Sequence, residues 1–340
     1  MKKINKKQIK QYLLQHISDK NLIKKAVENF EISKSTVYNY LRELLEDKAI
    51  IKDENSFKLN GVQHYFRYDT ETKLAEDKIF DEDIAPLLSD INKNVFSIWR
   101  YSFTEMMNNA IEHSLAKTIE VLVETNSINT LILICDDGIG IFKNIQNYML
   151  KEKNETLSYD ECATLLLSGK FTTAKHLHSG EGIFFTSHLM DRFMIYSDEV
   201  TFSRDSFKDL NFRIDTLSIK TGTFVSMLLH NSSKKTTKEI FDQFSNLDGD
   251  FIKTQIPIAH VFSNGNPVSR SEARRLGELV LKFEEIELDF ENVEEVGQAF
   301  CHELFVVWQS RNPEKNLKIT NANSDVQRMI NRVKNQLKTD

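Results

Sequence analysis

The chain has 340 residues, more than one domain of roughly 100 to 200 residues needs, so two or three domains are expected. Apolar residues make up 40%, charged residues 28%, and only 4 residues are proline, which excludes a disordered or collagen-like chain. Residues 1–60 hold 13 Lys and Arg against 8 Asp and Glu, a net charge of +5, whereas the other 280 residues hold 31 against 42, a net charge of −11.

The first 60 residues are predicted to form three short helices followed by two strands. Helical periodicity or strand-like alternation marks five segments in this part of the chain: residues 8–17, 21–29, 35–47, 49–52 and 56–59. Ser33 or Ser35 can cap the third helix, because a serine hydroxyl accepts a hydrogen bond from the free amides of the first turn. The order of these elements resembles a winged helix-turn-helix, in which the third helix is the recognition helix.

The outward face of this third helix is the candidate DNA contact. Val37 and Leu41 are expected to face the core, which leaves six side chains outward: Lys34, Ser35, Thr36, Tyr38, Asn39 and Arg42. A basic module fits double-stranded DNA, because Lys and Arg neutralise the backbone phosphates. The alternative is a small helical bundle that mediates dimerisation, with a second copy of the chain as partner.

Residues 61–84 show no clear period and are expected to be a connector. From about residue 85 to residue 235, helical and strand patterns alternate, which indicates an α/β domain. We expect helices at 97–114 and 182–191 and strands at 118–124, 130–135 and 223–229, with a connecting helix at 236–245.

The first chemical motif places Glu105 and Asn109 four residues apart, so a helix puts both on one face. An amide oxygen is a hard, neutral ligand suited to Mg²⁺ beside substrate phosphates. A carboxylate in this place can take a proton from water, or from an acceptor hydroxyl, as it attacks a γ-phosphate. Taken alone, such a pair is more often solvent-facing than functional.

The second motif, Asp136-Asp137-Gly138-Ile139-Gly140, follows an apolar run and so comes at the end of a buried strand. An ionised carboxylate at Asp136 only accepts hydrogen bonds, so it pairs with the amino group of adenine and repels the carbonyl of guanine. Gly138 and Gly140 let the backbone turn and approach the base closely. The alternative is an ordinary Asp-Gly turn between strands.

The third motif, Gly180-Glu181-Gly182-Ile183, opens an apolar helical run, so free amides at a helix N-terminus can face a phosphate. The preceding polar stretch, residues 169–175, could fold over a nucleotide as a lid, and Lys175 or Lys170 could then meet the phosphates. The alternative for either lysine is ordinary loop charge.

Together the three motifs resemble the GHKL ATPases, the family shared by gyrase, histidine kinases and anti-sigma-factor kinases. EMMNNAIEH resembles the N box, DDGIG the first glycine box and GEGI the second, with Ile183 in place of the more usual leucine. Thr223, in Thr-Gly-Thr, matches the family's late threonine near adenine. The resemblance covers roughly residues 85–232 and implies the Bergerat fold, an α/β sandwich with a helix layer on a mixed sheet.

The resemblance also implies roles for these residues, with ATP and Mg²⁺ as cofactors. Glu105 would be the general base, Asn109 the Mg²⁺ ligand and Asp136 the adenine contact. The glycines at 138, 140, 180 and 182 would make lid and phosphate contacts.

The C-terminal part, residues 250–340, is predicted to repeat strand and helix three times and resembles a STAS-like domain. The strand at 286–290 is followed by an amphipathic helix at 296–309, and residues 317–320 supply the next strand. In anti-sigma antagonists that family implies a phosphorylatable serine at the start of the helix. Here the sequence is Gly297-Gln298-Ala299, so docking of a protein partner or signal sensing is expected instead of self-phosphorylation.

The predicted architecture is therefore a multidomain α/β chain with a winged helix-turn-helix, an ATPase domain and a STAS-like domain. The leading hypothesis is an ATP-controlled transcriptional regulator. Two alternatives remain: a serine/threonine protein kinase of the anti-sigma type, and an ATPase component of a stress or phage-defence system.

The cysteines and the hydropathy of the chain predict its compartment. Cys135, Cys162 and Cys301 lie far apart without metal-ligand spacing, so they are expected to be buried, reduced thiols. No stretch approaches the roughly 20 apolar residues that span a bilayer. A cytoplasmic protein without membrane contact is expected.

Overall fold

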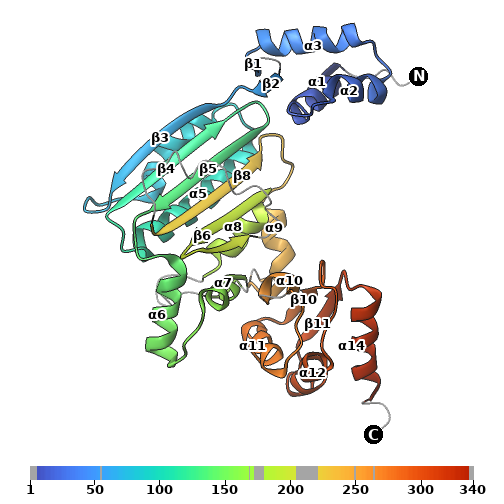
Figure 1. Cartoon of the computed structure of the whole chain (residues 1–340). Coiled ribbons are helices and arrows are strands. Elements are labelled where there is room, and N and C mark those ends of the chain that lie inside the picture. The colour runs from blue at the N-terminus through green and yellow to red at the C-terminus, as the bar shows by residue number, and fades with distance from the viewer. Residues whose placement is uncertain are drawn as a thin grey trace.

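The computed structural model describes residues 6–53, 56–167, 169–171, 180–203, 221–248, 250–262 and 265–336. The chain is a multidomain α/β protein in which three parts follow one another: a helical N-terminal module, a six-stranded sheet with a helix layer, and a three-stranded sheet with its own helices (Figure 1).

The N-terminal module contains the predicted elements within about two residues of the predicted bounds. It consists of α1 (Lys6–Gln15), α2 (Leu22–Phe30), α3 (Lys34–Glu46) and a hairpin of β1 (Ile50–Asp53) and β2 (Ser56–Leu59). Ser33 is the N-cap of α3: its Oγ accepts a hydrogen bond from the amide of Thr36 at 3.0 Å. Leu13, Val37 and Leu41 form the centre of a small core of their own.

The large sheet has the strand order β3-β4-β5-β8-β6-β7, and every neighbouring pair that the structure describes is antiparallel. The expectation of a mixed sheet is therefore wrong. The reason is the position of β8 (Thr223–His230), which lies between β5 (Asn129–Asp136) and β6 (Arg192–Ser197). Those two strands run parallel to each other, but β8 separates them and runs opposite to both. β4 (Thr118–Thr125) and β7 (Val200–Ser203) complete the pairs with β5 and β6.

The segment at 61–84 is not the expected connector. β3 (Val62–Asp69) pairs with β4 along its whole length as the outer strand of the sheet. It is followed by α4 (Glu76–Ile79) and two short helical turns, η1 (Phe80–Ile84) and η2 (Ala85–Leu88). Phe80 and Ile84 are fully buried in the core of the sheet domain, which therefore begins near residue 62 and not near residue 85.

The helices α5 (Lys93–His113) and α8 (Gly182–Leu189) lie against one face of the sheet, and α6 (Ile141–Lys153) and α7 (Tyr159–Leu167) lie below the sheet in the view of Figure 1. The predicted helix at 97–114 and strand at 130–135 were close to α5 and β5. α5 buries Trp99, Phe103 and Met107 against the sheet, and each of these side chains has no exposed surface. This packing holds one face of α5 beside the strand ends that carry the second motif.

The C-terminal part follows α9 (Thr237–Phe244) and repeats strand and helix as predicted. Its strands are β9 (Lys253–Pro257), β10 (Glu285–Asp289) and β11 (Asn316–Thr320), which form a parallel sheet in the order β11-β10-β9. The helices between and after them are short or segmented: α10 (Ile258–Val261), α11 (Arg270–Val280), α12 (Gln298–His302), η4 (Glu303–Trp308), α13 (Gln309–Arg311) and α14 (Ser324–Gln336).

All three cysteines are buried and unpaired with one another, which confirms the prediction of reduced, buried thiols. Within the described part of the chain, no helix has the length and apolar character that crossing a bilayer requires.

Candidate functional site

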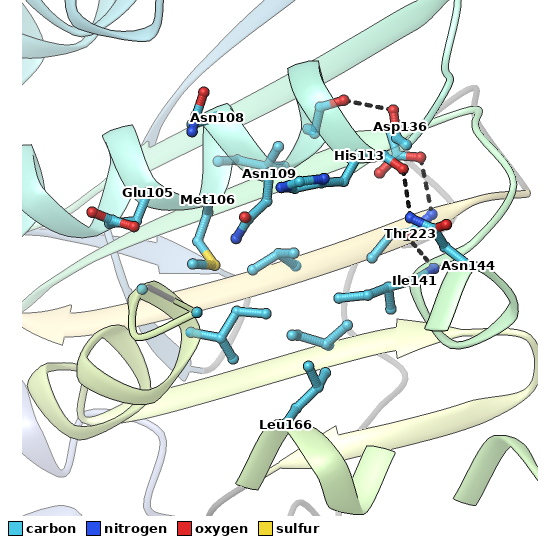
Figure 2. Close-up of a pocket in the computed structure, with 18 of the residues that line it drawn as sticks. Glu105, Met106, Asn108, Asn109, His113, Asp136, Ile141, Asn144, Leu166 and Thr223 are labelled. Carbon is cyan, nitrogen blue, oxygen red and sulfur yellow. Dashed lines mark hydrogen bonds between the residues drawn. The ribbon is translucent and has the colours of Figure 1, made fainter. Parts of the chain in front are cut away.

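A cavity of about 290 Å³ lies between α5 and the sheet. Six residues that the sequence singled out line it: Glu105, Asn109, Asp136, Gly180, Gly182 and Thr223. They come from α5, the end of β5, the start of α8 and the start of β8. Figure 2 shows Glu105 and Asp136 toward opposite ends of this cavity, with Asn109 and His113 between them.

The first and third motifs are in direct contact. Gly182 begins α8 so close to α5 that a methyl group on it would lie 2.1 Å from Oε2 of Glu105. Nothing larger than hydrogen therefore fits at residue 182 while the Glu105 carboxylate keeps its place. This contact joins a residue at the centre of a long helix to a loop almost 80 positions further along the chain.

Asp136 ends β5 and is 4% exposed. Its Oδ1 accepts hydrogen bonds from the backbone amides of Gly138 at 2.9 Å and Thr223 at 3.3 Å. Burial raises the pKa of Asp136 to about 6, and the hydrogen bonds from Gly138 and Thr223 oppose that shift. At neutral pH the site thus holds a buried, ionised carboxylate that accepts hydrogen bonds.

The glycines of the second motif shape the loop and are not among the residues that line the cavity. A Cβ on Gly138 would lie 2.1 Å from the carbonyl oxygen of Ser114. Gly140 has φ +87°, and a Cβ there would lie 2.5 Å from Oδ2 of Asp198. These glycines let the loop lie close against the end of α5 and the β6–β7 turn.

Thr223 connects the late strand to this loop. Its Oγ1 accepts a hydrogen bond from the amide of Ile141 at 3.0 Å, and its own amide donates to Asp136. Gly222 precedes it with φ +85°, and a Cβ there would lie 2.1 Å from the carbonyl oxygen of Asp136. The Thr-Gly-Thr turn is therefore held against the strand end, which fixes the Asp136 side of the cavity.

The glycine loop before α8 also approaches other backbone closely. Gly180 has φ +79°, and a Cβ on it would lie 2.5 Å from the carbonyl oxygen of Phe171. Lys175 lies outside the described residues. Lys170 is described but is not among the lining residues; its Nζ lies 5.3 Å from the ring centroid of Phe251 and 4.8 Å from that of Phe283. Lys170 therefore lies against aromatic rings and not on the wall of the cavity.

Two cavity residues were not predicted from the sequence. His113 lines the cavity on the same face of α5 as Asn109, four positions earlier. Asn144 on α6 also lines it, and its Nδ2 donates to the carbonyl oxygen of His113 at 2.9 Å. Helical spacing from Asn109 could have identified His113. Ile141 and Ile145, two apolar residues four positions apart, could have identified α6 as a helix with one face toward the cavity.

The side chains that line the cavity suit a cation that takes most of its ligands from water and phosphate oxygens. Among the described side chains, no group of three or more His, Cys, Asp or Glu is placed to hold a metal ion. Asn109 offers an amide oxygen at the cavity wall, and Mg²⁺ commonly binds one or two protein groups together with water and phosphates. A magnesium–phosphate complex therefore fits these residues better than a metal ion alone.

The candidate DNA-contacting residues all lie on α3. Five of the six are exposed, and Thr36 is half-buried with its Oγ1 2.8 Å from Oγ of Ser33. The exposed residues are Lys34, Ser35, Tyr38, Asn39 and Arg42. Val37 and Leu41 are buried, as expected.

Comparison with known proteins addresses the C-terminal part, whose three parallel strands alternate with helices. Residues 272–327 match a STAS-like domain of unknown function (DUF4325). The match runs from α11 to the first turn of α14, which agrees with the predicted STAS-like domain. No curated protein matches the chain.

The STAS-like domain begins its central helix where the sequence predicted. Gly297 is the residue before α12, which starts at Gln298 and Ala299. A Cβ on Gly297 would lie 2.4 Å from the carbonyl oxygen of Val268, so residue 297 is packed against the preceding loop. The place where anti-sigma antagonists are expected to carry a phosphorylatable serine thus has no hydroxyl group.

Proposed function

We propose that this chain binds ATP with Mg²⁺ in the cavity between α5 and the sheet, hydrolyses it, and uses the nucleotide state to control DNA binding by residues 1–60. One observation carries the proposal: residues from all three motifs and from the late threonine turn line a single cavity. Their order along the chain resembles that of the GHKL ATPase motifs.

The two ends of the cavity differ in chemistry, as a nucleotide requires. At one end the buried carboxylate of Asp136 accepts a hydrogen bond from the exocyclic amino group of adenine and disfavours the carbonyl of guanine. Asn109, Gly180 and Gly182 line the part of the cavity away from Asp136, where phosphates and their Mg²⁺ would be held. Bound Mg²⁺ would neutralise charge on the phosphate oxygens.

Hydrolysis requires a base beside the γ-phosphate. In this proposal Glu105 accepts a proton from a water molecule while the water oxygen bonds to the γ-phosphorus, and the bond from that phosphorus to the bridging oxygen of ADP breaks. The products are ADP, inorganic phosphate and one proton, which the carboxylate returns to solvent. Contact with Gly182 holds the carboxylate against the loop that would cradle the phosphates.

The N-terminal module is joined closely enough to the sheet domain to respond to it. Only residues 60 and 61 separate β2 from β3, and Oγ of Ser127 in the β4–β5 turn donates to the carbonyl oxygen of Ala49 at 3.4 Å. The exposed face of α3, with Lys34 and Arg42, supplies the positive charge that DNA phosphates attract.

The test compares the parent protein with Asn109→Ala and Glu105→Gln. We expect calorimetric binding of ATP with Mg²⁺ to the parent, much weaker binding to Asn109→Ala, and binding without phosphate release by Glu105→Gln. Retention of a mixed-sequence DNA duplex should depend on nucleotide in the parent only. Equal retention with and without ATP would reject the coupling to DNA, and no ATP binding by the parent would reject the whole proposal.

Phosphotransfer to a protein partner is the second candidate, and the resemblance of the three motifs to those of anti-sigma-factor kinases supports it. Glu105 would then take the proton of a partner's serine or threonine hydroxyl. Incubation with γ-labelled ATP separates the two reactions: label released as free phosphate supports hydrolysis, and label on a co-purified protein supports the kinase.

A further inference from the structure

The first turn of the helix that begins at the cavity packs into the core of the STAS-like domain. α8 starts with Gly182, and two residues later Phe184 and Phe185 are each 1% exposed. Both rings belong to the same buried cluster as Phe251 and Phe283, which flank the C-terminal sheet. The ring centroid of Phe251 lies 4.7 Å from that of Phe184, 5.0 Å from that of Phe185 and 5.1 Å from that of Phe283.

Lys170 makes a second attachment to the same domain. Its Nζ lies over the rings of Phe251 and Phe283, an arrangement in which a cation is attracted to the negative face of an aromatic ring. The carbonyl oxygen of Lys170 accepts a hydrogen bond from Nζ of Lys282 at 2.9 Å. Burial lowers the pKa of Lys170, and the negative charge of the cavity residue Glu181 opposes that shift. Lys170 therefore lies between the glycine loop and the STAS-like domain.

Helix α7 supplies a third attachment on another wall of the cavity. Glu161 forms an ion pair with Arg275 of α11, and Oγ1 of Thr164 donates to the carbonyl oxygen of Val261 at 3.3 Å. Leu166, on the same helix, lines the cavity. Both helices that border the cavity beyond α5 and α6 are thus held by residues of the C-terminal part.

These attachments pass a displacement of the cavity wall on to the STAS-like domain, because the helices that carry them are short and stiff. Gly182 and Phe185 are three residues apart on one helix, a rise of about 4.5 Å, so a shift of the loop moves the rings with it. The rings lie in a close-packed core, which does not absorb such a shift without a change in the packing of the STAS-like domain. A displacement at the cavity is therefore expected to change the packing of the STAS-like core, and a change in that core to displace the cavity wall.

We propose that the STAS-like domain positions the phosphate end of the nucleotide cavity, with Phe251 and Phe283 as positioning residues that act through Lys170 and α8. ATP binding and the packing of that domain are then coupled, and the coupling is reciprocal: whatever tightens one tightens the other. A partner that binds the STAS-like domain would change nucleotide affinity without touching the cavity. This inference rests on the proposed function, because it assigns a regulator to the same site.

The first test is a set of substitutions at Lys170. We expect Lys170→Gln to weaken ATP binding about fivefold, because the cation over the rings is lost, and Lys170→Arg to restore it, because a guanidinium also lies well on an aromatic face. Lys318→Gln is the matched control: its Nζ pairs with Glu287 at 3.0 Å in the same domain, away from α8. An unchanged affinity in Lys170→Gln would overturn the proposal.

A double-mutant cycle separates positioning from direct contact with a phosphate. If Phe251 acts through Lys170, then Phe251→Leu alone should also weaken ATP binding, and the double variant with Lys170→Gln should be no weaker than the stronger single change. Additive losses would show that Lys170 acts independently of the ring and would overturn the assignment. Far-ultraviolet circular dichroism establishes that each variant is folded.

The reciprocal test uses amide hydrogen exchange on the full chain. A non-hydrolysable ATP analogue should slow exchange at residues 251–257 and 283–288 in the parent and leave it unchanged in Asn109→Ala. Analogue binding by the parent without any change in those segments overturns this inference and leaves the proposed ATP site intact. A parent protein that binds no analogue rejects the ATP site itself, and with it the inference.

Discussion

At the scale of single residues, Asp136 is a carboxylate whose surroundings oppose its charge. It is 4% exposed, and burial raises its pKa to about 6 from an ordinary value of 3.8. A carboxyl group with a raised pKa stabilises the folded state fully below pH 3.8, and that contribution is lost as the pH rises through 6. At neutral pH the ionised form is retained at a cost to stability.

Replacement of Asp136 by Asn should therefore stabilise the protein without nucleotide. The free energy of unfolding at pH 7.5 should increase by about 2 kcal/mol, because the amide carries no charge to desolvate and its oxygen still accepts from the amides of Gly138 and Thr223. Chemical denaturation measures this gain, and the difference from the parent should shrink as the pH falls from 7.5 to 5. ATP binding should be lost, because the amide oxygen stays with those two backbone amides and the Nδ2 donor of asparagine then faces the amino group of adenine, which is also a donor.

Asp137→Asn is the control for that change. Asp137 is exposed, and its Oδ1 accepts from the amides of Lys117 at 2.7 Å and Thr118 at 2.9 Å. Its replacement should leave ATP affinity near the parent value and should give no comparable gain in stability. A gain at residue 137 as large as that at residue 136 would contradict the account from burial.

At the scale of elements, the contact of α5 with α8 brings the first and third motifs together. Gly182→Ala is a favourable change for an isolated helix, yet its methyl group would lie 2.1 Å from Oε2 of Glu105. We expect a folded protein with unchanged thermal stability and phosphate release about 10²-fold slower, because the carboxylate moves from its place. Gly61→Ala, whose methyl group would meet only the Glu124 side chain at 3.3 Å, should keep full activity.

The position of β3 gives a second prediction at this scale. A chain that begins at residue 62 should unfold cooperatively, whereas one that begins at residue 85 should not, because it lacks an entire edge strand and the buried side chains of Ile79, Phe80 and Ile84. Thermal denaturation followed by circular dichroism compares the two. Cooperative unfolding of the shorter chain would show that residues 62–84 are dispensable.

Sequence patterns located most of these elements but not their neighbours. The helix at 97–114, the strand at 118–124 and the C-terminal alternation could be predicted, because each has a clear period of its own. β3 was missed because its inward positions are His64, Phe66 and Tyr68 and an outward one is Tyr65, so polarity does not alternate cleanly with burial. The antiparallel order around β8 depends on pairing across 90 residues, which no local pattern encodes.

In the candidate site too, local motifs could be predicted from the sequence and contacts between distant residues could not. Glu105, Asn109 and Asp136 were found because the motif spacing reports helix faces and strand ends. The position of the Lys170 side chain could not be predicted, because it depends on contacts with the rings of Phe251 and Phe283. Those residues are distant in sequence and belong to a different domain.

At the scale of the whole molecule, charge divides the protein into a basic end and an acidic body. The exposed face of α3 should therefore carry a salt-dependent affinity for DNA. Arg42→Gln should weaken binding of a mixed-sequence duplex and reduce the slope of log affinity against log salt by about one, if Arg42 contacts one phosphate. Fluorescence anisotropy over a range of salt concentrations measures the slope. Lys24→Gln, which changes an exposed side chain on α2, should leave this slope unchanged.

The location of β8 also determines when the large sheet can be completed. Residues 223–230 are the last of its strands to leave the ribosome, yet they lie in the middle of the sheet, between β5 and β6. Until they are synthesised, the β3-β4-β5 meander and the β6-β7 hairpin each expose an unpaired strand edge, and such edges are prone to pair with other chains. Completion of the sheet should therefore be a late, long-range step, and the nascent chain is most exposed to aggregation while the ribosome reads the codons between β7 and β8.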